Sequence, residues 1–193
     1  MARKKNFVEA DVLEKALGLF WERGYNATSV QDLVDHLGIN RASIYDTWGD
    51  KHGLYLETLK HYRQHTSHYL LGKLRSERSA KEIVKDFLYD VVNDSVHDDM
   101  RKGCFMANSA TEMANCDSTV YRMFTDNRIK MEGVLNELIK EGQERGEFAT
   151  KFDSQAYARF IFNTASGLRT LAKGTIAEKE LNEVVDVALS ALV

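Results

Sequence analysis

Residues 28–51 read TSVQDLVDHLGINRASIYDTWGDK and predict a helix, a tight turn and a second helix. Thr28 is the expected N-cap of the first helix, because Gln31 follows three residues later and completes a capping box. Apolar residues then recur at helical spacing. Gly38 is the expected end of this helix, since glycine readily takes the left-handed conformation of a C-terminal stop.

The second helix is expected over residues 41–48, with Asn40 as its N-cap. Ile44 and Trp48 lie one turn apart and should face inward, which leaves a small, polar and basic outer surface. Such a helix suits the major groove of DNA, which is about 12 Å wide and admits one α-helix. The alternative is a helical hairpin whose outer face is only solvated. The residues left on the outer faces are Arg41, Ala42, Ser43, Tyr45 and Thr47.

The run GINRASIYDTWGDKHGL, residues 38–54, resembles the recognition helix and following turn of the TetR/AcrR family of bacterial transcriptional regulators. The resemblance implies an all-α fold, with a helix-turn-helix DNA-binding domain in residues 1–50. A larger helical domain for effector binding and dimerisation would follow in residues 51–193. The positions that carry the resemblance are Ala16, Leu19, Phe20, Gly24, Tyr25, Thr28, Tyr45, Trp48, Gly49, Asp50, Lys51 and Leu54.

The function implied by this resemblance is repression of transcription. A homodimer would bind a palindromic operator, with two heads about 34–36 Å apart, and a small-molecule or reactive-compound effector would release it. The last two helices would pair with their two-fold mates into a four-helix bundle. The alternative function is a helical ligand-binding or interaction protein that does not bind DNA.

Arg41 is the best candidate for reading a base, because a bidentate arginine–guanine contact is the commonest specific one. Asp46 departs from expectation, because an acid facing DNA repels phosphates unless it accepts from a cytosine amino group. Further base contacts are expected from Gln31, Ala42 and Ser43. Phosphate contacts are expected from Thr28, Ser29, Tyr45, Thr47 and Lys51.

The composition is that of a helical, globular protein and not of a general nucleic-acid binder. The 193 residues include no proline, 44% are hydrophobic and 28% are charged, which favours helices and argues against disorder. The formal net charge of −3 predicts modest non-specific affinity for DNA and reliance on two specific half-sites. Surface charge acts only locally, over about 10 Å at 0.1 M salt. The basic residues near the expected contact face are Arg3, Lys4, Lys5, Arg41 and Lys51.

Further helices follow from apolar periodicity, and the pattern contains no alternating strand signal. Capping boxes are expected at Ser79 with Glu82 and at Thr175 with Glu178. The expected helices span residues 9–23, 51–75, 80–97, 103–115, 118–146, 153–173 and 178–192.

An effector pocket in the C-terminal region is implied by the resemblance, and its candidates are aromatic and polar residues expected to point inward. The alternative for each is an ordinary place in the core. The candidates are Tyr62, Tyr69, Phe87, Cys104, Asn108, Tyr121, Phe124, Phe160 and Asn163.

Cys104 and Cys116 are candidates for a sensor of oxidants or electrophiles. Cys104 opens a helix, whose N-terminus favours the reactive thiolate, and KGCFMANSATEMA resembles a helix of one subset of the family. The alternative is that each is a small buried hydrophobe without a disulfide, because a cytoplasmic thiol stays reduced.

Other sites have weaker signals. His61, His65 and His68 share one helix face and, with a carboxylate from elsewhere, could bind zinc or nickel. Because they flank the apolar stripe and do not lie in it, we expect no metal and no cofactor. No phosphate loop, HExxH motif or Ser-His-Asp order with glycine turns suggests an enzyme. Because the charged N-terminus has no apolar signal core and no long apolar run follows, we expect a cytoplasmic protein without membrane contact.

Overall fold

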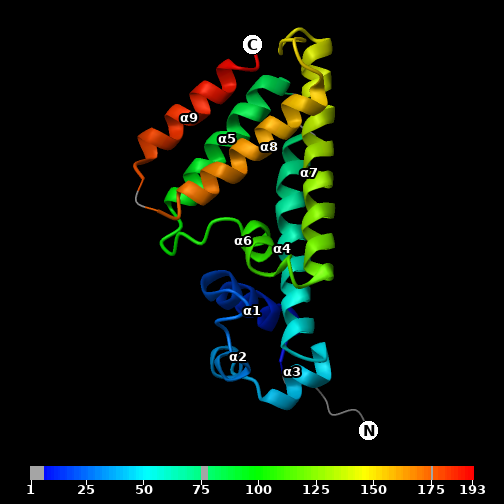
Figure 1. Ribbon diagram of the computed structural model, residues 1–193, viewed down its shortest axis with the longest axis vertical. Helices are drawn as coiled ribbons and strands as arrows, with labels where there is room; N and C mark the ends of the chain where they lie inside the picture. The colour runs from blue at the N-terminus through cyan, green and yellow to red at the C-terminus, as the bar shows by residue number, and fades with distance from the viewer. Residues whose placement is uncertain (1–6, 75–77, 175) are drawn as a thin grey trace. The chain divides into compact units, whose positions relative to one another are not determined.

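The computed structural model describes residues 7–74, 78–174 and 176–193, with the side chains of 66–71, 73 and 74 excepted. Within these ranges the regular structure consists of nine α-helices and contains no strand, so the predicted all-α fold is confirmed (Figure 1). The helices are α1 (Glu9–Arg23), α2 (Val30–Leu37), α3 (Arg41–Trp48), α4 (Lys51–Leu74), α5 (Ala80–Val96), α6 (Phe105–Met113), α7 (Ser118–Glu144), α8 (Ser154–Leu171) and α9 (Glu178–Ser190).

The chain divides into two compact units, and each unit combines two separate segments of the sequence. The first unit runs up to His65 and also includes Phe105–Phe124, so α6 and the start of α7 belong with α1–α3. The second unit comprises Thr66–Cys104 and Thr125–Val193. The helices α4 and α7 therefore each contribute residues to both units.

Aromatic side chains form the centre of the first unit. Phe20 of α1 and Tyr55 of α4 meet edge to face with their ring centroids 5.1 Å apart, and Phe105 of α6 meets Tyr55 at 5.8 Å. All three residues are at most 1% exposed. Edge-to-face pairs add to the stabilisation from burial, so α6 is an integral part of this core.

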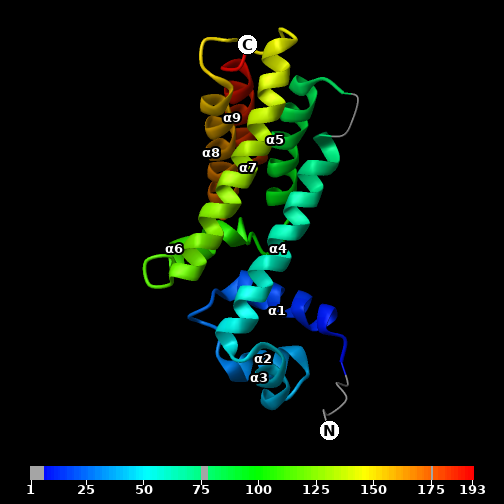
Figure 2. The ribbon, with the colours of Figure 1, turned by 90° about the vertical axis from the view of Figure 1, so that its right-hand side faces the viewer.

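The core of the second unit lies among α5, α7, α8 and α9. In two views the helices α5, α8 and α9 lie side by side (Figures 1 and 2). Alanines at the contacts, including Ala158, Ala165 and Ala188, are buried and allow close approach of the helices. The larger side chains of this core include Phe87, Leu88, Leu135, Ile139, Ile161, Leu168, Leu181 and Val185.

Most predicted helix ends agree with the structure to within two or three residues, including the capping box of Ser79 with Glu82. The helix α9 begins at Glu178, as predicted, but its capping differs from the prediction. The N–H of Ala177 donates to Glu180 at 2.9 Å, so the first-turn acceptor is Glu180 and not Glu178. Thr175, the predicted cap, lies outside the described residues, as do Arg3, Lys4 and Lys5 of the predicted basic arm.

In the described part of the chain, none of the helices combines the length and the apolar character that a membrane crossing needs.

Burial of Tyr55 predicts a pH dependence of folding. Its burial, the largest cause, raises the pKa of Tyr55 from the usual 10.0 to about 12. The folded state holds this proton more tightly than the unfolded chain, so the resulting stabilisation is complete below pH 10 and is lost as the pH rises to 12. We expect the free energy of unfolding of the wild type, measured in urea, to fall by on the order of 2–3 kcal/mol over this pH range. The Tyr55→Phe variant should not show this fall.

Tyr121→Phe is the matched control, because the Tyr121 side chain is 56% exposed and its removal should leave the pH dependence of the wild type in place. Identical pH profiles for wild type and Tyr55→Phe would contradict the prediction.

Candidate nucleic-acid interface

The predicted helix–turn–helix is present as α2, a short turn and α3. Leu33 and Ile44 are fully buried and hold the two helices against the rest of the first unit. Gly38 ends α2 in the left-handed conformation, with a φ of 68°. The side chain of Asn40 accepts from the N–H of Ser43 at 2.8 Å and caps α3, as predicted. Two short helices are thus fixed by burial on one side and by caps at their ends.

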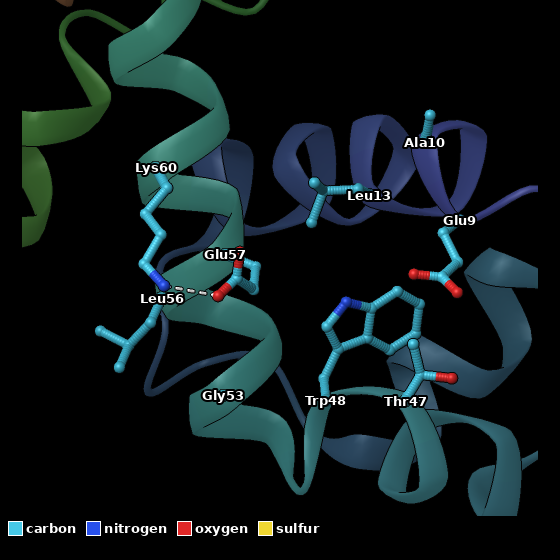
Figure 3. Close-up of a pocket in the computed structure, with 9 residues that line it drawn as sticks. All are labelled: Glu9, Ala10, Leu13, Thr47, Trp48, Gly53, Leu56, Glu57 and Lys60. Carbon is cyan, nitrogen blue, oxygen red and sulfur yellow. Dashed lines mark hydrogen bonds and ion pairs between the residues drawn. The ribbon is translucent and has the colours of Figure 1, made fainter.

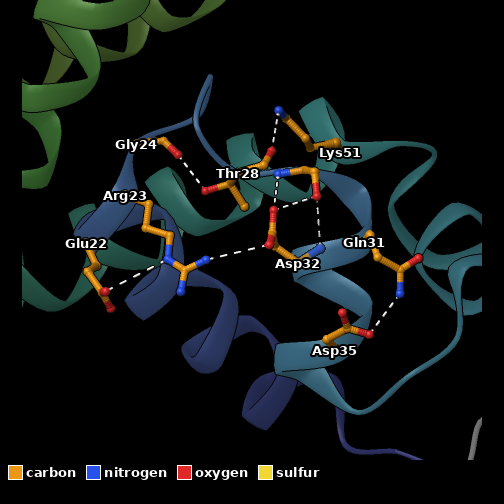
Figure 4. A network of polar contacts seen from close by, with 9 residues as sticks. Glu22, Arg23, Gly24, Thr28, Gln31, Asp32, Asp35 and Lys51 are labelled. Carbon is orange, nitrogen blue, oxygen red and sulfur yellow. Dashed lines mark hydrogen bonds and ion pairs between the residues drawn. The ribbon is translucent and has the colours of Figure 1, made fainter.

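The cap of α2 is Ser29 and not Thr28, so that prediction was wrong. The Ser29 hydroxyl accepts from the N–H of Asp32 at 3.1 Å, and the Asp32 carboxylate accepts from the N–H of Ser29 at 2.8 Å (Figure 4). Thr28 is fully buried, and its hydroxyl donates to the carbonyl of Gly24 at 2.7 Å. Gln31, the predicted partner, donates instead to Asp35 one turn further on, at 2.8 Å.

The same hydrogen bonds set the charge state of Asp32. Its contacts with the hydroxyl and the N–H of Ser29, aided by Arg23 at 3.6 Å, lower the pKa of this carboxyl. Asp32 is therefore a carboxylate at neutral pH, in the first turn of α2, where a negative charge is favourable.

The outer face of α3 is open to solvent over most of its length. Arg41, Ala42, Tyr45 and Asp46 are exposed, with Tyr45 42% exposed, and Ser43 is half-buried. Ser29, the cap of α2, and Gln31 on α2 are exposed as well. The predicted base contacts thus come from exposed or half-buried positions of two adjacent helices, and their roles toward DNA remain predictions.

Thr47 and Trp48 sit at the other end of α3. The Thr47 hydroxyl is buried and has no hydrogen-bond partner among the described residues, so its predicted phosphate contact remains only a prediction. Trp48 is half-buried and stacks on Phe7 with ring centroids 6.1 Å apart.

A cavity of about 430 Å³ lies beside Trp48 (Figure 3). Figure 3 shows the indole between Glu9 and Leu13 of α1 and Glu57 of α4, and Glu57 accepts from Lys60 at 2.6 Å. The lining residues are Glu9, Ala10, Leu13, Thr47, Trp48, Gly53, Leu56, Glu57 and Lys60. None of these belongs to the predicted effector pocket.

Lys51 is engaged inside the first unit. Its ammonium donates to the carbonyls of Tyr25 at 2.8 Å and Thr28 at 2.6 Å, and it lies 4.1 Å from the centroid of the Tyr25 ring. Desolvation lowers the pKa of Lys51, while the nearby charge of Glu112 opposes that change. A phosphate contact by Lys51 would compete with these three interactions within the protein. The predicted contact therefore remains a prediction.

Two acidic residues of the first unit make contacts that the sequence did not predict, although Asp117 itself was a predicted cap of the helix that follows it. Glu112 of α6 accepts from the N–H groups of Tyr25 and Asn26. Asp117 contacts His52 of α4 at 2.5 Å and accepts from the first N–H groups of α7. Burial of Asp117 works against its charge, but the hydrogen bonds from His52 and from these N–H groups outweigh burial and lower its pKa. Both contacts join residues more than sixty positions apart, so no local pattern announces them.

The predicted effector residues are distributed over both units. In the first unit Tyr62, Asn108 and Phe124 are half-buried and Tyr121 is exposed. The remaining described members belong to the second unit. There Phe87 is buried in the core, Cys104 is half-buried, and Phe160 and Asn163 are exposed on α8. The Tyr69 side chain lies outside the description. An effector pocket built from these residues remains a prediction.

Neither Cys104 nor Cys116 is joined in a disulfide. Cys104 directly precedes α6 and is half-buried, while Cys116 is exposed and its sulfur lies 3.4 Å from the carbonyl oxygen of Met113. Their roles as redox sensors remain untested.

Of the three histidines on α4, His61 contacts Glu14 at 2.8 Å and its ring centroid lies 4.5 Å from that of His65. The side chain of His68 lies outside the description. Among the described residues, no three side chains of the types that bind metals gather into one group.

Comparison with known proteins assigns both parts of the chain. Residues 12–58 match the model of bacterial regulatory proteins of the tetR family, and residues 84–188 match a tetracyclin repressor-like C-terminal domain. The uncharacterized HTH-type transcriptional regulator YezE of Bacillus subtilis (strain 168) is 34% identical over the whole of both chains. The HTH-type transcriptional repressor ComR of Escherichia coli (strain K12) is 26% identical over 97% of this chain and 90% of that protein.

A solved structure is similar over the whole length of both chains. It is a cysteine mutant of the TetR family transcriptional regulator CifR complexed with 26-base-pair double-strand operator DNA, with a TM-score of 0.87 and 27% identity.

The reassigned cap of α2 predicts which substitution weakens the helix–turn–helix. Ser29→Ala should lower the free energy of unfolding by about 1 kcal/mol in urea, because the N–H of Asp32 loses its acceptor. Gln31→Ala is the matched control and should cost only a few tenths of a kcal/mol, since its exposed amide bonds only within its own helix. A larger loss for Gln31→Ala than for Ser29→Ala would show that the cap is wrongly assigned.

Proposed function

This chain belongs to the TetR family of bacterial transcriptional regulators, and from that premise we propose that it is a repressor that binds a palindromic operator as a homodimer. Its relatives are transcriptional regulators and not enzymes. A small molecule or a reactive compound would release the repressor from DNA by favouring a different setting of the two heads.

The observation that carries the proposal is the exposed face of α3 on a rigid support. Ile44 on the inner side is fully buried, whereas Arg41, Ala42 and Tyr45 are exposed. An eight-residue helix braced in this way can enter a major groove without rearrangement. The proposal is supported by a relative of the same length and similar fold, CifR, whose mutant is described in complex with operator DNA.

Within this interface we assign Arg41 to a guanine, because its guanidinium can donate two parallel hydrogen bonds to one base edge. Gln31, Ala42 and Ser43 would complete the base contacts. Ser29 and Tyr45 are the exposed candidates for phosphate contacts. The N–H groups at the start of α3 add a favourable partial charge toward a phosphate.

The proposed dimer surface is an apolar face of α8 and α9. Val187 is 70% exposed, Leu171 52%, and Phe160 and Val184 are each 41% exposed. A hollow of about 400 Å³ on this face is lined by Phe160, Thr164, Glu180, Glu183, Val184, Val187 and Ala188. Large apolar side chains gathered on one surface typically mark a protein–protein contact. A second copy of the same face would cover it in a two-fold arrangement.

The division of labour that we propose places DNA binding in residues 1–50 and effector binding and dimerisation in residues 51–193. Of the candidates from the sequence analysis, the half-buried Tyr62, Asn108 and Phe124 are the ones that we propose for effector binding.

A selection experiment tests the DNA-binding proposal. The protein is incubated with fragments of its own genome, the retained DNA is sequenced, and affinities for a recovered fragment are measured by fluorescence anisotropy. Arg41→Ala should cost about 1–3 kcal/mol in binding the recovered fragment and should relax the preference at one base pair.

Arg145→Ala is the matched control, because Arg145 is an exposed arginine of the second unit paired with Glu141 on α7, and it should bind as the wild type does. A folded wild type that retains no fragment would favour the alternative of an interaction protein without DNA binding.

The dimer proposal has its own test. Val187→Asp should give monomers in analytical ultracentrifugation at micromolar concentration, because the association would bury a carboxylate in an apolar contact. Ile129→Asp, at a position on α7 that is 56% exposed, should remain dimeric. A monomeric wild type, or a dimeric Val187→Asp, would contradict the assigned surface.

A further inference from the structure

The turn between α1 and α2 leads into the helix–turn–helix, and most of its peptide groups lie outside the helical hydrogen-bond pattern. The helix α1 ends at Arg23, and Ser29 already caps α2, so residues 24–28 form the connection. The N–H of Gly24 donates to the carbonyl of Phe20 at 2.8 Å and that of Thr28 donates to the carbonyl of Tyr25 at 3.3 Å. The remaining N–H groups need partners from side chains or from water. The partners that they find determine where α2 begins.

Glu112 of α6 supplies partners for two of the N–H groups. One carboxylate oxygen accepts from the N–H of Tyr25 at 3.0 Å, and the other accepts from the N–H of Asn26 at 2.6 Å. Hydrogen bonds to a carboxylate are roughly twice as strong as those between neutral groups. One side chain thus ties two consecutive peptide groups of the turn to a helix that lies more than eighty residues away in sequence.

The neighbouring glycine is what lets the carboxylate come this close. A Cβ atom added to Gly24 would lie 2.8 Å from the nearer oxygen of Glu112, which is closer than real Cβ contacts. Gly24 also has a φ of +83°, a region in which other residues are strained. The backbone conformation therefore favours glycine at this position, and a Cβ atom there would push the Glu112 carboxylate away from its present place.

Lys51 of α4 binds carbonyl groups of the same turn. Its ammonium donates to the carbonyls of Tyr25 and Thr28, at 2.8 Å and 2.6 Å. The N–H groups of the turn thus face the negative carboxylate of Glu112, and its C=O groups face the positive ammonium of Lys51. Both arrangements are electrostatically favourable for the peptide dipoles. Thr28, the last residue that Lys51 holds, directly precedes the cap of α2.

We propose that Glu112 is a positioning residue for DNA binding, which fixes the α1–α2 turn and thereby the place at which α2 and α3 meet the duplex. The inference rests on the proposed function, because a chain that binds no DNA has nothing to position. Without the carboxylate, the turn samples several positions. The apparent affinity for DNA then falls in proportion to the fraction of molecules whose turn is correctly placed.

The direction in which DNA affinity changes distinguishes a positioning role of Glu112 from a purely electrostatic one. Removing a negative charge from a DNA-binding protein ordinarily strengthens its attraction to phosphates. Glu112→Gln removes the charge, retains the shape and leaves one acceptor oxygen for two N–H groups. Positioning therefore predicts weaker binding by this variant, whereas a purely electrostatic role predicts stronger binding.

The first arm of the test measures affinity for a fragment recovered by the genomic selection. We expect Glu112→Ala to bind about tenfold more weakly than the wild type, with Glu112→Gln between the two. Glu147→Ala is the matched control, because Glu147 accepts from the N–H of Lys81 at 3.0 Å in the second unit and should not affect DNA affinity. Unchanged or tighter binding by Glu112→Gln would overturn the proposal, as would an equal loss in Glu147→Ala.

The second arm measures hydrogen exchange of individual amides by NMR in the full chain without DNA. In Glu112→Ala, or in Glu112→Gln if the alanine variant does not fold, the amides of Tyr25 and Asn26 should exchange about tenfold faster, while amides in the middle of α1 keep their rates. Wild-type exchange at both positions would show that Glu112 does not hold the turn.

Together the two measurements distinguish a failure of the proposed function from a failure of the inference about Glu112. If the wild type retains no genomic fragment, the proposed function fails, and the positioning role for DNA fails with it. Faster exchange at Tyr25 and Asn26 would still establish that the carboxylate holds the turn. Retained DNA together with wild-type exchange in the variant would leave the proposed function standing and refute this inference alone.

Discussion

An eight-residue helix does not persist in water on its own hydrogen bonds, and α2 and α3 are both of that length. Their order is imposed by the rest of the first unit, through burial of Leu33 and Ile44 and through the caps at Ser29 and Asn40. This dependence is the physical constraint on the whole interface. Any residue that fixes the ends of these helices contributes to what they present to DNA, even where it lies far from them in sequence and never approaches a base.

The acidic net charge is compatible with DNA binding because acids near the interface are engaged by the protein itself. Asp32 accepts from the cap of α2, Asp35 accepts from Gln31, and Glu112 accepts from the α1–α2 turn. Such carboxylates stabilise peptide dipoles and helix starts, so they contribute order as well as charge. Asp46 remains exposed on α3, and nothing in the structure explains an acid at that position. We therefore expect affinity for DNA to depend more on accurate placement of a few groups than on overall electrostatic attraction.

Local patterns predicted the helices well, whereas one failure has a local cause and another results from contacts that are distant in sequence. Periodicity and Gly38 located α2 and α3, because each signal acts over a few residues. The choice between Thr28 and Ser29 as cap was not decidable in this way, since each is followed three residues later by a side chain able to complete a capping box. The structure decides for Ser29 because the hydroxyl of Thr28 already donates to the carbonyl of Gly24. Glu112 could not be found at all, because its partners are 86 and 87 residues away.

The same long-range contacts explain why the first compact unit is not a continuous stretch of sequence. A fragment ending at residue 50 would retain α1, α2 and α3 but would lose Tyr55, against which Phe20 packs, and Phe105, against which Trp21 packs. It would also lose Lys51 and Glu112, so the N–H groups of Tyr25 and Asn26 and the carbonyl of Thr28 would lose their side-chain partners. The residues proposed to contact DNA therefore occupy the start of the chain, while the structure that holds them includes α6. A boundary drawn by function and a boundary drawn by packing answer different questions, and in this chain they fall at different residues.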